Sequence, residues 1–215
     1  MVIAMAEIQQ FSKARLLDAA LKVVRSKGYT AARIEDICAE AGVTKGSFFH
    51  HFKSKDDLAL AAVAHWDATT GGVFAQAPYH ALPDPLDRLL AYLDLRKELL
   101  AGELPDFTCF AGMIVQEAYE THPELAAACA ASISRHASTL QADIETAIET
   151  CGIAEAWSAE SLALHMQAVL QGAFVLAKAQ GGAAVAADSI DHLRRYLTLL
   201  FRPGGSKPRT KTKGK

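Results

Sequence analysis

The sequence lacks the residue patterns on which most enzyme and metal sites depend. It contains no Gly-rich phosphate-binding loop, no Gly-x-Ser-x-Gly nucleophile elbow and no His-Glu-x-x-His motif. Its four cysteines include no Cys-x-x-Cys pair, so neither a zinc ribbon nor a thioredoxin-like redox site is supported. We therefore expect no catalytic residue, no metal and no cofactor.

Long apolar runs and a secretory leader are also missing. No apolar run approaches the roughly 20 residues that a helix needs to cross a bilayer. The N-terminus, MVIAMAEIQQ, has no basic segment followed by a long apolar run, which a signal peptide would have. These absences predict a cytoplasmic protein without membrane association, in which the cysteines are reduced.

Strand patterns and internal repeats are absent as well, whereas helical patterns are frequent. Hydrophobic residues make up 51% of the 215 residues, enough for a sizeable core. Apolar residues recur at intervals of three and four between capping residues, glycines and prolines. The pattern predicts an all-α fold with about nine helices, over residues 12–27, 34–41, 45–51, 55–75, 85–101, 107–120, 123–151, 158–180 and 188–201.

Charge is distributed unevenly along the chain. Residues 1–55 carry nine Lys and Arg against five Asp and Glu, and residues 56–201 carry seven against nineteen. Residues 202–215 carry six basic residues and no acidic one. A basic N-terminal segment on an acidic body favours an orientation toward a polyanion such as DNA.

The segment IEDICAEAGVTKGSFFHHFKSK, residues 34–55, predicts two short helices joined by a tight turn. Gly42 fits the position just past a helix end, and Thr44 is a good cap for the second helix. In that second helix, Phe48 and Phe52 lie four apart on an inward face, while small, basic and hydrogen-bonding residues point outward. Such a helix suits insertion into a DNA major groove.

The run GVTKGSFFHHFKSKDDL resembles the helix-turn-helix signature of the TetR family of transcriptional regulators, over roughly residues 12–60. The resemblance implies an all-helical dimeric repressor. We expect a DNA-binding domain at residues 1–54 (the head), a ligand-binding and dimerisation domain at residues 55–202 (the body), and a disordered basic tail at residues 203–215.

The resemblance also indicates which head residues contact DNA. The alternative is that these residues are only polar side chains exposed to water. Phe49 stands where the family more often has a tyrosine that touches a phosphate. Ala32 and Arg33 replace a hydroxyl pair that usually caps the preceding helix, which predicts a weaker cap. The candidates are Arg33, Thr44, Lys45, Gly46, Ser47, Phe49, His50, His51, Lys53 and Lys55.

In the body, a regulator of this type needs a pocket for a small apolar or electrophilic effector. His136 is a single polar group on a long apolar stripe, which fits either a ligand contact or a core histidine with a satisfied ring. The other candidates fit either a pocket wall or ordinary core in the same way. The candidates are Trp66, Phe74, Tyr92, Phe107, Cys109, Met113, Tyr119, His136, Met166 and Phe174.

Cys109 has a second possible role. The spacing of Cys109, Gly112 and Glu117 resembles the start of a helix in TetR-type repressors that sense electrophiles, such as the regulator of N-ethylmaleimide reductase. A thiol at a helix start can become reactive, although a small buried hydrophobe is the alternative. Cys38, Cys129 and Cys151 lie on expected core faces and should be inert.

The function that these features imply is a homodimeric repressor of a palindromic operator, released by its effector. The long helix after the recognition helix would link ligand to DNA, and the last two helices would form the dimer interface. An alternative is a ligand-independent dimeric DNA-binding protein, whose body only dimerises. An all-helical enzyme has no catalytic constellation behind it.

Overall fold

The computed structural model describes residues 2–153 and 157–202, and for residues 2–10 it describes only the backbone. Within these ranges the regular structure is helical and no strand occurs, so the predicted all-α class is confirmed. The tail expected at residues 203–215 lies outside the described residues.

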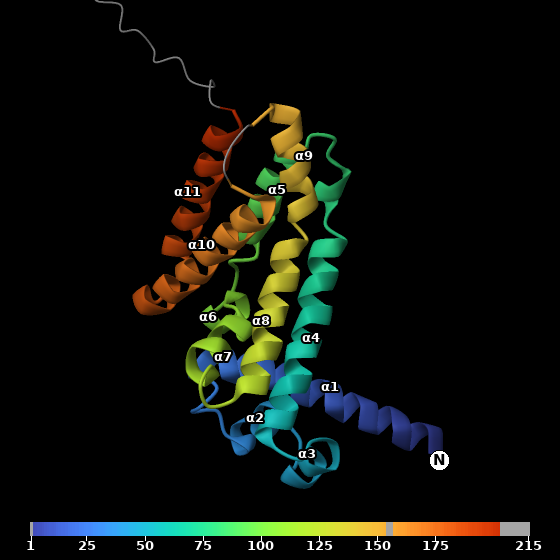
Figure 1. The fold of residues 1–215 in the computed structure, drawn as a ribbon. Helices are drawn as coiled ribbons and strands as arrows, with labels where there is room; N and C mark the ends of the chain where they lie inside the picture. The colour runs from blue at the N-terminus through green and yellow to red at the C-terminus, as the bar shows by residue number, and fades with distance from the viewer. Residues whose placement is uncertain (1, 154–156, 203–215) are drawn as a thin grey trace, which may run out of the picture.

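The head consists of the first three helices, which meet at one end of the molecule (Figure 1). They are α1 (Val2–Lys27), α2 (Ile34–Ala41) and α3 (Lys45–His51). The sequence predicts that the first helix begins at Ser12, but α1 begins at Val2. No proline or glycine interrupts residues 2–11, so the helix continues toward the N-terminus past the candidate cap.

The turn between α2 and α3 has the predicted capping chemistry. Gly42 takes a left-handed conformation with φ of +62°, and Thr44 Oγ1 accepts a hydrogen bond from the Ser47 N–H at 3.2 Å. The weaker cap expected at Arg33 is offset within the helix, because Asp36 Oδ2 accepts the Arg33 N–H at 3.2 Å. The predicted helix-turn-helix is therefore formed by local hydrogen bonds.

The body follows as a bundle in which α4 and α8 lie side by side and lead away from the head (Figure 1). Its later helices α10 and α11 pack against each other on the opposite side from α4. The body elements are α4 (Lys55–Ala75), the 3-10 helix η1 (Pro78–Ala81), α5 (Pro85–Glu98), α6 (Leu104–Phe107), α7 (Phe110–Ala118), α8 (Pro123–Ser138), α9 (Gln141–Cys151), α10 (Ala159–Gln180) and α11 (Ala184–Phe201).

Two expected helices are divided, and this corrects the predicted ranges 107–120 and 123–151. Thr108 and Cys109 are extended between α6 and α7. Phe107 therefore packs against the cluster formed by α5, α9, α10 and α11, whereas Phe110 belongs to the cluster that the body shares with the head. Between α8 and α9, the Thr139 hydroxyl donates to the His136 carbonyl at 2.8 Å. Such hydroxyl-to-backbone bonds compete with helical ones, and here the chain turns.

Smaller differences occur at other helix ends. The helix α5 ends at Glu98 and not at Ala101, and α11 begins at Ala184 and not at Asp188. The glycine pair at residues 71–72 does not interrupt α4, which continues to Ala75 as predicted. Ser54 caps α4 by accepting the Asp57 N–H at 3.1 Å.

The hydrophobic core has a lower and an upper cluster, and the lower one is shared between head and body. The lower cluster contains Leu16 and Phe48 from the head together with Leu58 of α4, Phe110 of α7 and Leu125 of α8. The upper cluster joins α5, α9, α10 and α11. The head is therefore packed onto the body and does not hang from it by α4 alone.

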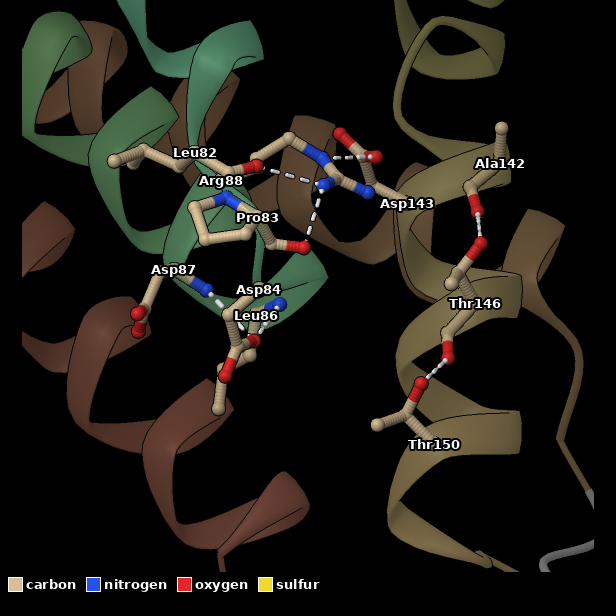
Figure 2. Close-up of polar contacts among 10 residues, drawn as sticks. All are labelled: Leu82, Pro83, Asp84, Leu86, Asp87, Arg88, Ala142, Asp143, Thr146 and Thr150. Carbon is tan, nitrogen blue, oxygen red and sulfur yellow. Dashed lines mark hydrogen bonds and ion pairs between the residues drawn. The ribbon is translucent and has the colours of Figure 1, made fainter.

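A half-buried arginine fastens α5 to α9 in the upper body (Figure 2). Arg88 Nε donates to Asp143 Oδ1 of α9 at 2.7 Å, while its Nη1 donates to the carbonyls of Leu82 and Pro83. Asp84 caps α5 by accepting the Leu86 N–H at 2.8 Å. One side chain thus fixes both the entry to α5 and its packing on α9.

The helix α10 corrects the expectation that no stretch is apolar enough to span a membrane. It has 22 residues and contains an 18-residue window with a mean hydropathy of 1.3, so it qualifies by length and composition alone. Core helices of soluble proteins pass the same test, and α10 packs against α8, α9 and α11. Its buried residues include Met166 and Leu170, which are fully covered.

Neighbouring phenylalanines in α3 give a test of this packing. Phe48 is 0% exposed and Phe49 is 56% exposed. Phe48→Ala should lower the free energy of unfolding by about 3–5 kcal/mol, because it removes a ring from the shared core. Phe49→Ala should change it by less than about 1 kcal/mol. Urea unfolding at fixed protomer concentration measures both, and equal losses would contradict the assigned orientation of α3.

Candidate nucleic-acid interface and body cavity

The helix α3 presents a small polar face to solvent. Thr44, Lys45, Gly46 and His50 are exposed, as is Lys53 just after the helix. Its inner face is closed by Phe48 and Phe52, which are 0% and 3% exposed. The predicted inward position of Phe48 and Phe52 is therefore confirmed, as is the outward position of Lys45 and His50.

Gly46 leaves open space on this outward face. A Cβ atom built at Gly46 would meet only Thr44 Oγ1, at 3.7 Å. The packing of the protein itself therefore does not require glycine there. The absent side chain leaves room for a partner surface to approach the backbone of α3.

The ammonium group of Lys45 is near the outward face but has a carboxylate partner. Lys45 Nζ lies 2.5 Å from Glu35 Oε1 of α2, and both side chains are more than half exposed. Exposed ion pairs contribute little to stability because water screens them. The lysine can therefore exchange this carboxylate for another anion at small cost.

Two of the candidate DNA residues have internal contacts instead of outward ones. His51 is half-buried, its Nε2 lies 2.7 Å from Ser12 Oγ of α1, and burial lowers its pKa. Lys55 Nζ donates to the carbonyls of Tyr29 and Ala32 at 3.0 and 3.2 Å, and lies 4.4 Å from the Tyr29 ring centre. Both side chains stabilise the head, which corrects our placement of His51 on the outward face.

Residues of the body form hydrogen bonds with the C-terminal end of α1 and the turn that follows it. Lys178 Nζ of α10 donates to the Arg25 carbonyl at 2.9 Å, and Glu117 Oε2 of α7 accepts the Thr30 N–H at 2.8 Å. Gly28 has φ of +89°, and a Cβ atom there would lie 2.4 Å from Glu117 Oε1. Movement of α7 or α10 would therefore act on the head through α1.

A cavity of about 460 Å³ lies between head and body. Helices α1, α4, α5, α8 and α10 contribute to its wall, as does the segment around α6. Six of the ten predicted ligand residues line it, and they are mostly aromatic. These are Trp66, Phe74, Phe107, Cys109, His136 and Phe174.

The other four predicted residues are elsewhere. Met113 lines a neighbouring hollow of about 210 Å³, which shares Cys109 and Phe174 with the main cavity. Met166 is 0% exposed in the upper core, and Tyr119 is 65% exposed on the surface, so neither lines the cavity. Tyr92 is fully buried, and only its hydroxyl points toward cavity-lining groups.

A polar cluster at one end of the cavity was not foreseen as a unit. Arg96 Nε donates to the Tyr92 hydroxyl at 2.9 Å, and Arg96 Nη2 donates to His136 Nε2 at 3.1 Å. Gln167, 4% exposed, directs its amide toward the same hydroxyl at 3.4 Å. The spacing of Tyr92 and Arg96, one helical turn apart, was the signal in the sequence that could have paired them.

His136 is held neutral in this cluster. Burial first, and then the positive charge of Arg96, lower its pKa to about 3. Because Nε2 accepts from Arg96, the ring proton belongs on Nδ1. The expectation of a satisfied histidine is met, and the same ring also lines the cavity.

Cys109 caps α7, as its predicted place at a helix start requires. Its Sγ accepts the Gly112 N–H at 3.3 Å, and the side chain is half-buried between the two hollows.

Burial raises the pKa of the Cys129 thiol to about 12 and also raises that of Cys38, which fits inert thiols. Cys151 is exposed, which corrects its expected place in the core. No cluster of potential metal ligands occurs among the described residues.

Comparison with known proteins agrees with this architecture. The family described as "Bacterial regulatory proteins, tetR family" matches residues 16–62, and "Tetracyclin repressor-like, C-terminal domain" matches residues 85–193, about half of the chain. The transcriptional regulator AcuR of Cereibacter sphaeroides is 31% identical over 102 residues, or 47% of either chain. The chain thus spans about half the length of this curated relative.

Solved structures share most of the fold. A TetR-family transcriptional regulator from Agrobacterium tumefaciens matches with a TM-score of 0.77 and 23% identity, over 87% of this chain and 98% of its own. A TetR regulator from Chloroflexus aurantiacus matches with a TM-score of 0.76 and 27% identity, over 89% and 96%. Since both head and body match, the chain belongs to the tetR family of bacterial regulatory proteins, a family of regulators and not of enzymes.

Proposed function

We propose that this protein is a homodimeric, DNA-binding transcriptional regulator that leaves its operator when a small molecule fills the body cavity. The observation that carries the proposal is the position of the cavity between the head and the body. It is lined by Leu21 and Arg25 of α1 and by Trp66 and Phe74 of α4. A ligand there would touch both helices that position the head.

DNA binding is supported by the outward face of α3. The interface would use Thr44, Lys45, Gly46, Ser47 and His50 toward the groove, with phosphate contacts nearby. The phosphate contacts would come from Arg33, Phe49 and Lys53. Phosphate contacts set affinity and its salt dependence, and few side chains select the sequence. A two-fold dimer should prefer a palindrome with half-sites roughly 34 Å apart.

Release requires that the effector distinguish two states of the protein. A ligand shifts an equilibrium only if it binds one state better than the other. Filling the cavity would move α1 relative to α4 and so change the separation of the two heads. Cys109, in the cavity wall, is the residue with which an electrophilic effector would react.

Dimerisation is supported by an apolar face on α10 and α11. Leu164, Val175 and Leu176 of α10 are 44–48% exposed, and Tyr196 and Leu199 of α11 are 45% and 68% exposed. Large exposed apolar residues gathered on two packed helices mark an interaction surface. A second copy of the chain would cover them in a four-helix arrangement, and the protein would act in the cytoplasm where its operator is.

The ligand-independent alternative predicts a body that no small molecule stabilises. A thermal-shift screen with aromatic acids, quinones and aldehydes separates the two functions. Stabilisation by one class, together with loss of operator binding, supports regulated release. No stabilisation by any compound, with DNA binding intact, supports the alternative.

Lys53 tests the phosphate contacts of the interface. An operator selected from random duplexes should bind Lys53→Gln more weakly, with the slope of log affinity against log salt reduced by about 0.9 for each head. Lys97→Gln is the matched control, because this exposed lysine pairs with Asp191 in the body. Fluorescence anisotropy at several salt concentrations measures the slope, and an unchanged slope for Lys53→Gln would remove this residue from the interface.

Phe49 offers a gain-of-affinity test. Phe49→Tyr adds a hydroxyl to a ring that is 56% exposed, so it can donate to a phosphate. Operator affinity should rise by roughly 3- to 10-fold, the worth of one such hydrogen bond. Phe49→Ala should lower it. The same anisotropy titration measures both variants, and no gain from the tyrosine would argue that Phe49 does not face the DNA backbone.

A positive charge placed in the apolar face of α10 and α11 tests the dimer interface. Leu199→Arg should give a monomer of 23.0 kDa, whereas wild type should have twice this mass. Leu82→Arg is the control, because Leu82 is 37% exposed on the loop before α5 and belongs to neither α10 nor α11. Light scattering after size exclusion reports the mass. Wild-type protein that is monomeric at micromolar concentration would refute the interface.

A further inference from the structure

Arg96 brings a positive charge to the cavity without a carboxylate to balance it. Its side chain is half-buried and lines the cavity wall. Among the described side chains, residues 11–153 and 157–202, no carboxylate lies within ion-pair distance of its guanidinium group. Cations that are removed from water are ordinarily paired, so this one calls for an explanation.

The groups that do contact Arg96 are neutral. They are the Tyr92 hydroxyl and the unprotonated Nε2 of His136, at 2.9 and 3.1 Å. The guanidinium carbon also lies 4.7 Å from the centre of the Phe74 ring, which fixes its plane. These contacts orient Arg96 but leave its charge uncompensated, and its Nη1 has no hydrogen-bond partner within the described part of the chain.

The acidic residues of the cavity wall are engaged elsewhere. Asp67 binds the Ser132 hydroxyl and the Arg135 guanidinium. Asp18 Oδ1 lies 2.7 Å from His65 Nε2. Asp106 Oδ2 accepts the Glu103 N–H at 2.8 Å as part of the cap of α6. None of the three lies within ion-pair distance of Arg96.

A second arginine in the wall is less available than Arg96. Arg25 Nε donates to the Leu21 carbonyl at 2.9 Å, and its Nη1 donates to the Asp106 carbonyl at 3.1 Å. Its guanidinium also lies over the Trp66 ring, at 5.2 Å from the centre. These contacts tie it to the backbone, so Arg96 is the better partner for an anion.

We infer that the effector of this protein is an organic anion, a carboxylate on an apolar body, whose charged group binds Arg96. The inference rests on the proposed function and names its ligand class. A guanidinium binds a carboxylate through parallel N–H···O bonds, and such bonds are strong in a water-poor site. The aromatic walls at Phe74, Phe107 and Phe174 would cover the apolar part of the ligand.

The size and the polar groups of the cavity agree with this class. About 460 Å³ is within the range of small-molecule sites and admits an acid with a phenyl ring or a short alkyl chain. Gln171 also lines the wall and has no hydrogen-bond partner within the described residues, so it can bind the second carboxylate oxygen or a ring substituent. Neutral analogues would leave Arg96 uncompensated.

Matched pairs of ligands test the inference directly on the wild-type protein. Benzoate, 3-phenylpropanoate and octanoate are compared with their primary amides by isothermal titration calorimetry. At least one acid should bind at least 10-fold more tightly than its own amide, because only the acid neutralises Arg96. Amides that bind as tightly as their acids, or binding by no acid of the panel, would overturn the inference.

Variants on α5 locate the charged contact. Arg96→Gln should weaken acid binding by roughly 10- to 100-fold and leave amide binding within about threefold. Arg96→Lys keeps the charge without the planar fork and should give a smaller loss. Lys97→Gln removes one positive charge from the next residue, outside the cavity, and should bind acids like wild type. Equal acid affinity in wild type and Arg96→Gln would refute the site.

Tryptophan emission checks that binding occurs in this cavity and in a folded protein. Trp66 lines the cavity, whereas Trp157 packs against Phe201 in the upper core. In a Trp157→Phe background, a bound acid should therefore change the emission of Trp66. An Arg96 variant that does not fold fails the circular-dichroism check, and the acid–amide comparison in wild type then decides alone.

Operator binding in the same samples separates this inference from the proposed function. Protein that binds its operator and is released by a neutral compound, but takes up no acid, keeps the proposed function and loses the inference. Protein that binds acids through Arg96 without any change in DNA binding keeps the inferred site and loses regulated release. Acid binding that releases the operator in wild type, and needs about 10- to 100-fold more acid in Arg96→Gln, supports both.

Discussion

The hydrophobic cluster that the head and the body share is the interaction on which the rest of the structure depends. The Phe48 ring is fully buried in this cluster, which also includes Leu58 of α4, Phe110 of α7 and Leu125 of α8. A recognition helix as short as α3 cannot hold its conformation alone, because isolated helices below about 12 residues are marginal in water. Its stability therefore comes from packing on α1 and α2, and α1 in turn packs on the body helices α4, α6 and α7.

Shared packing also explains how a body cavity can influence the head. Packed cores switch between discrete arrangements and do not deform continuously, so a small displacement at the cavity can become a change in helix position. The end of α1 and the turn after it are hydrogen-bonded to the body at the Arg25 carbonyl and the Thr30 N–H. The head is thus connected to the body through α1 as well as through α4, which the sequence indicated as the link.

Local chemistry determined how much of this could be predicted. The caps at Gly42 and Thr44 and the aromatic face of α3 depend on neighbours within a few residues, so the sequence was sufficient. The division of the expected helix at Cys109 follows from tertiary packing, because Phe107 and Phe110 enter different clusters. The cavity cluster was missed for the same reason, since Arg96 and His136 are 40 residues apart and meet only in the fold.

Arg96 shows how a ligand site can be recognised from a charged side chain that has no partner of opposite charge within the protein. A guanidinium among aromatic rings, without a carboxylate, stabilises the fold less than a well-packed apolar residue would. Its neutral partners Tyr92 and His136 hold it in one orientation but leave its charge uncompensated. An anion would supply the missing charge and stabilise the bound state in proportion to the logarithm of its concentration above its dissociation constant. The half-buried charge would therefore gain a counter-ion only in the ligand-bound state, and such a difference between two states is what a ligand-controlled regulator requires.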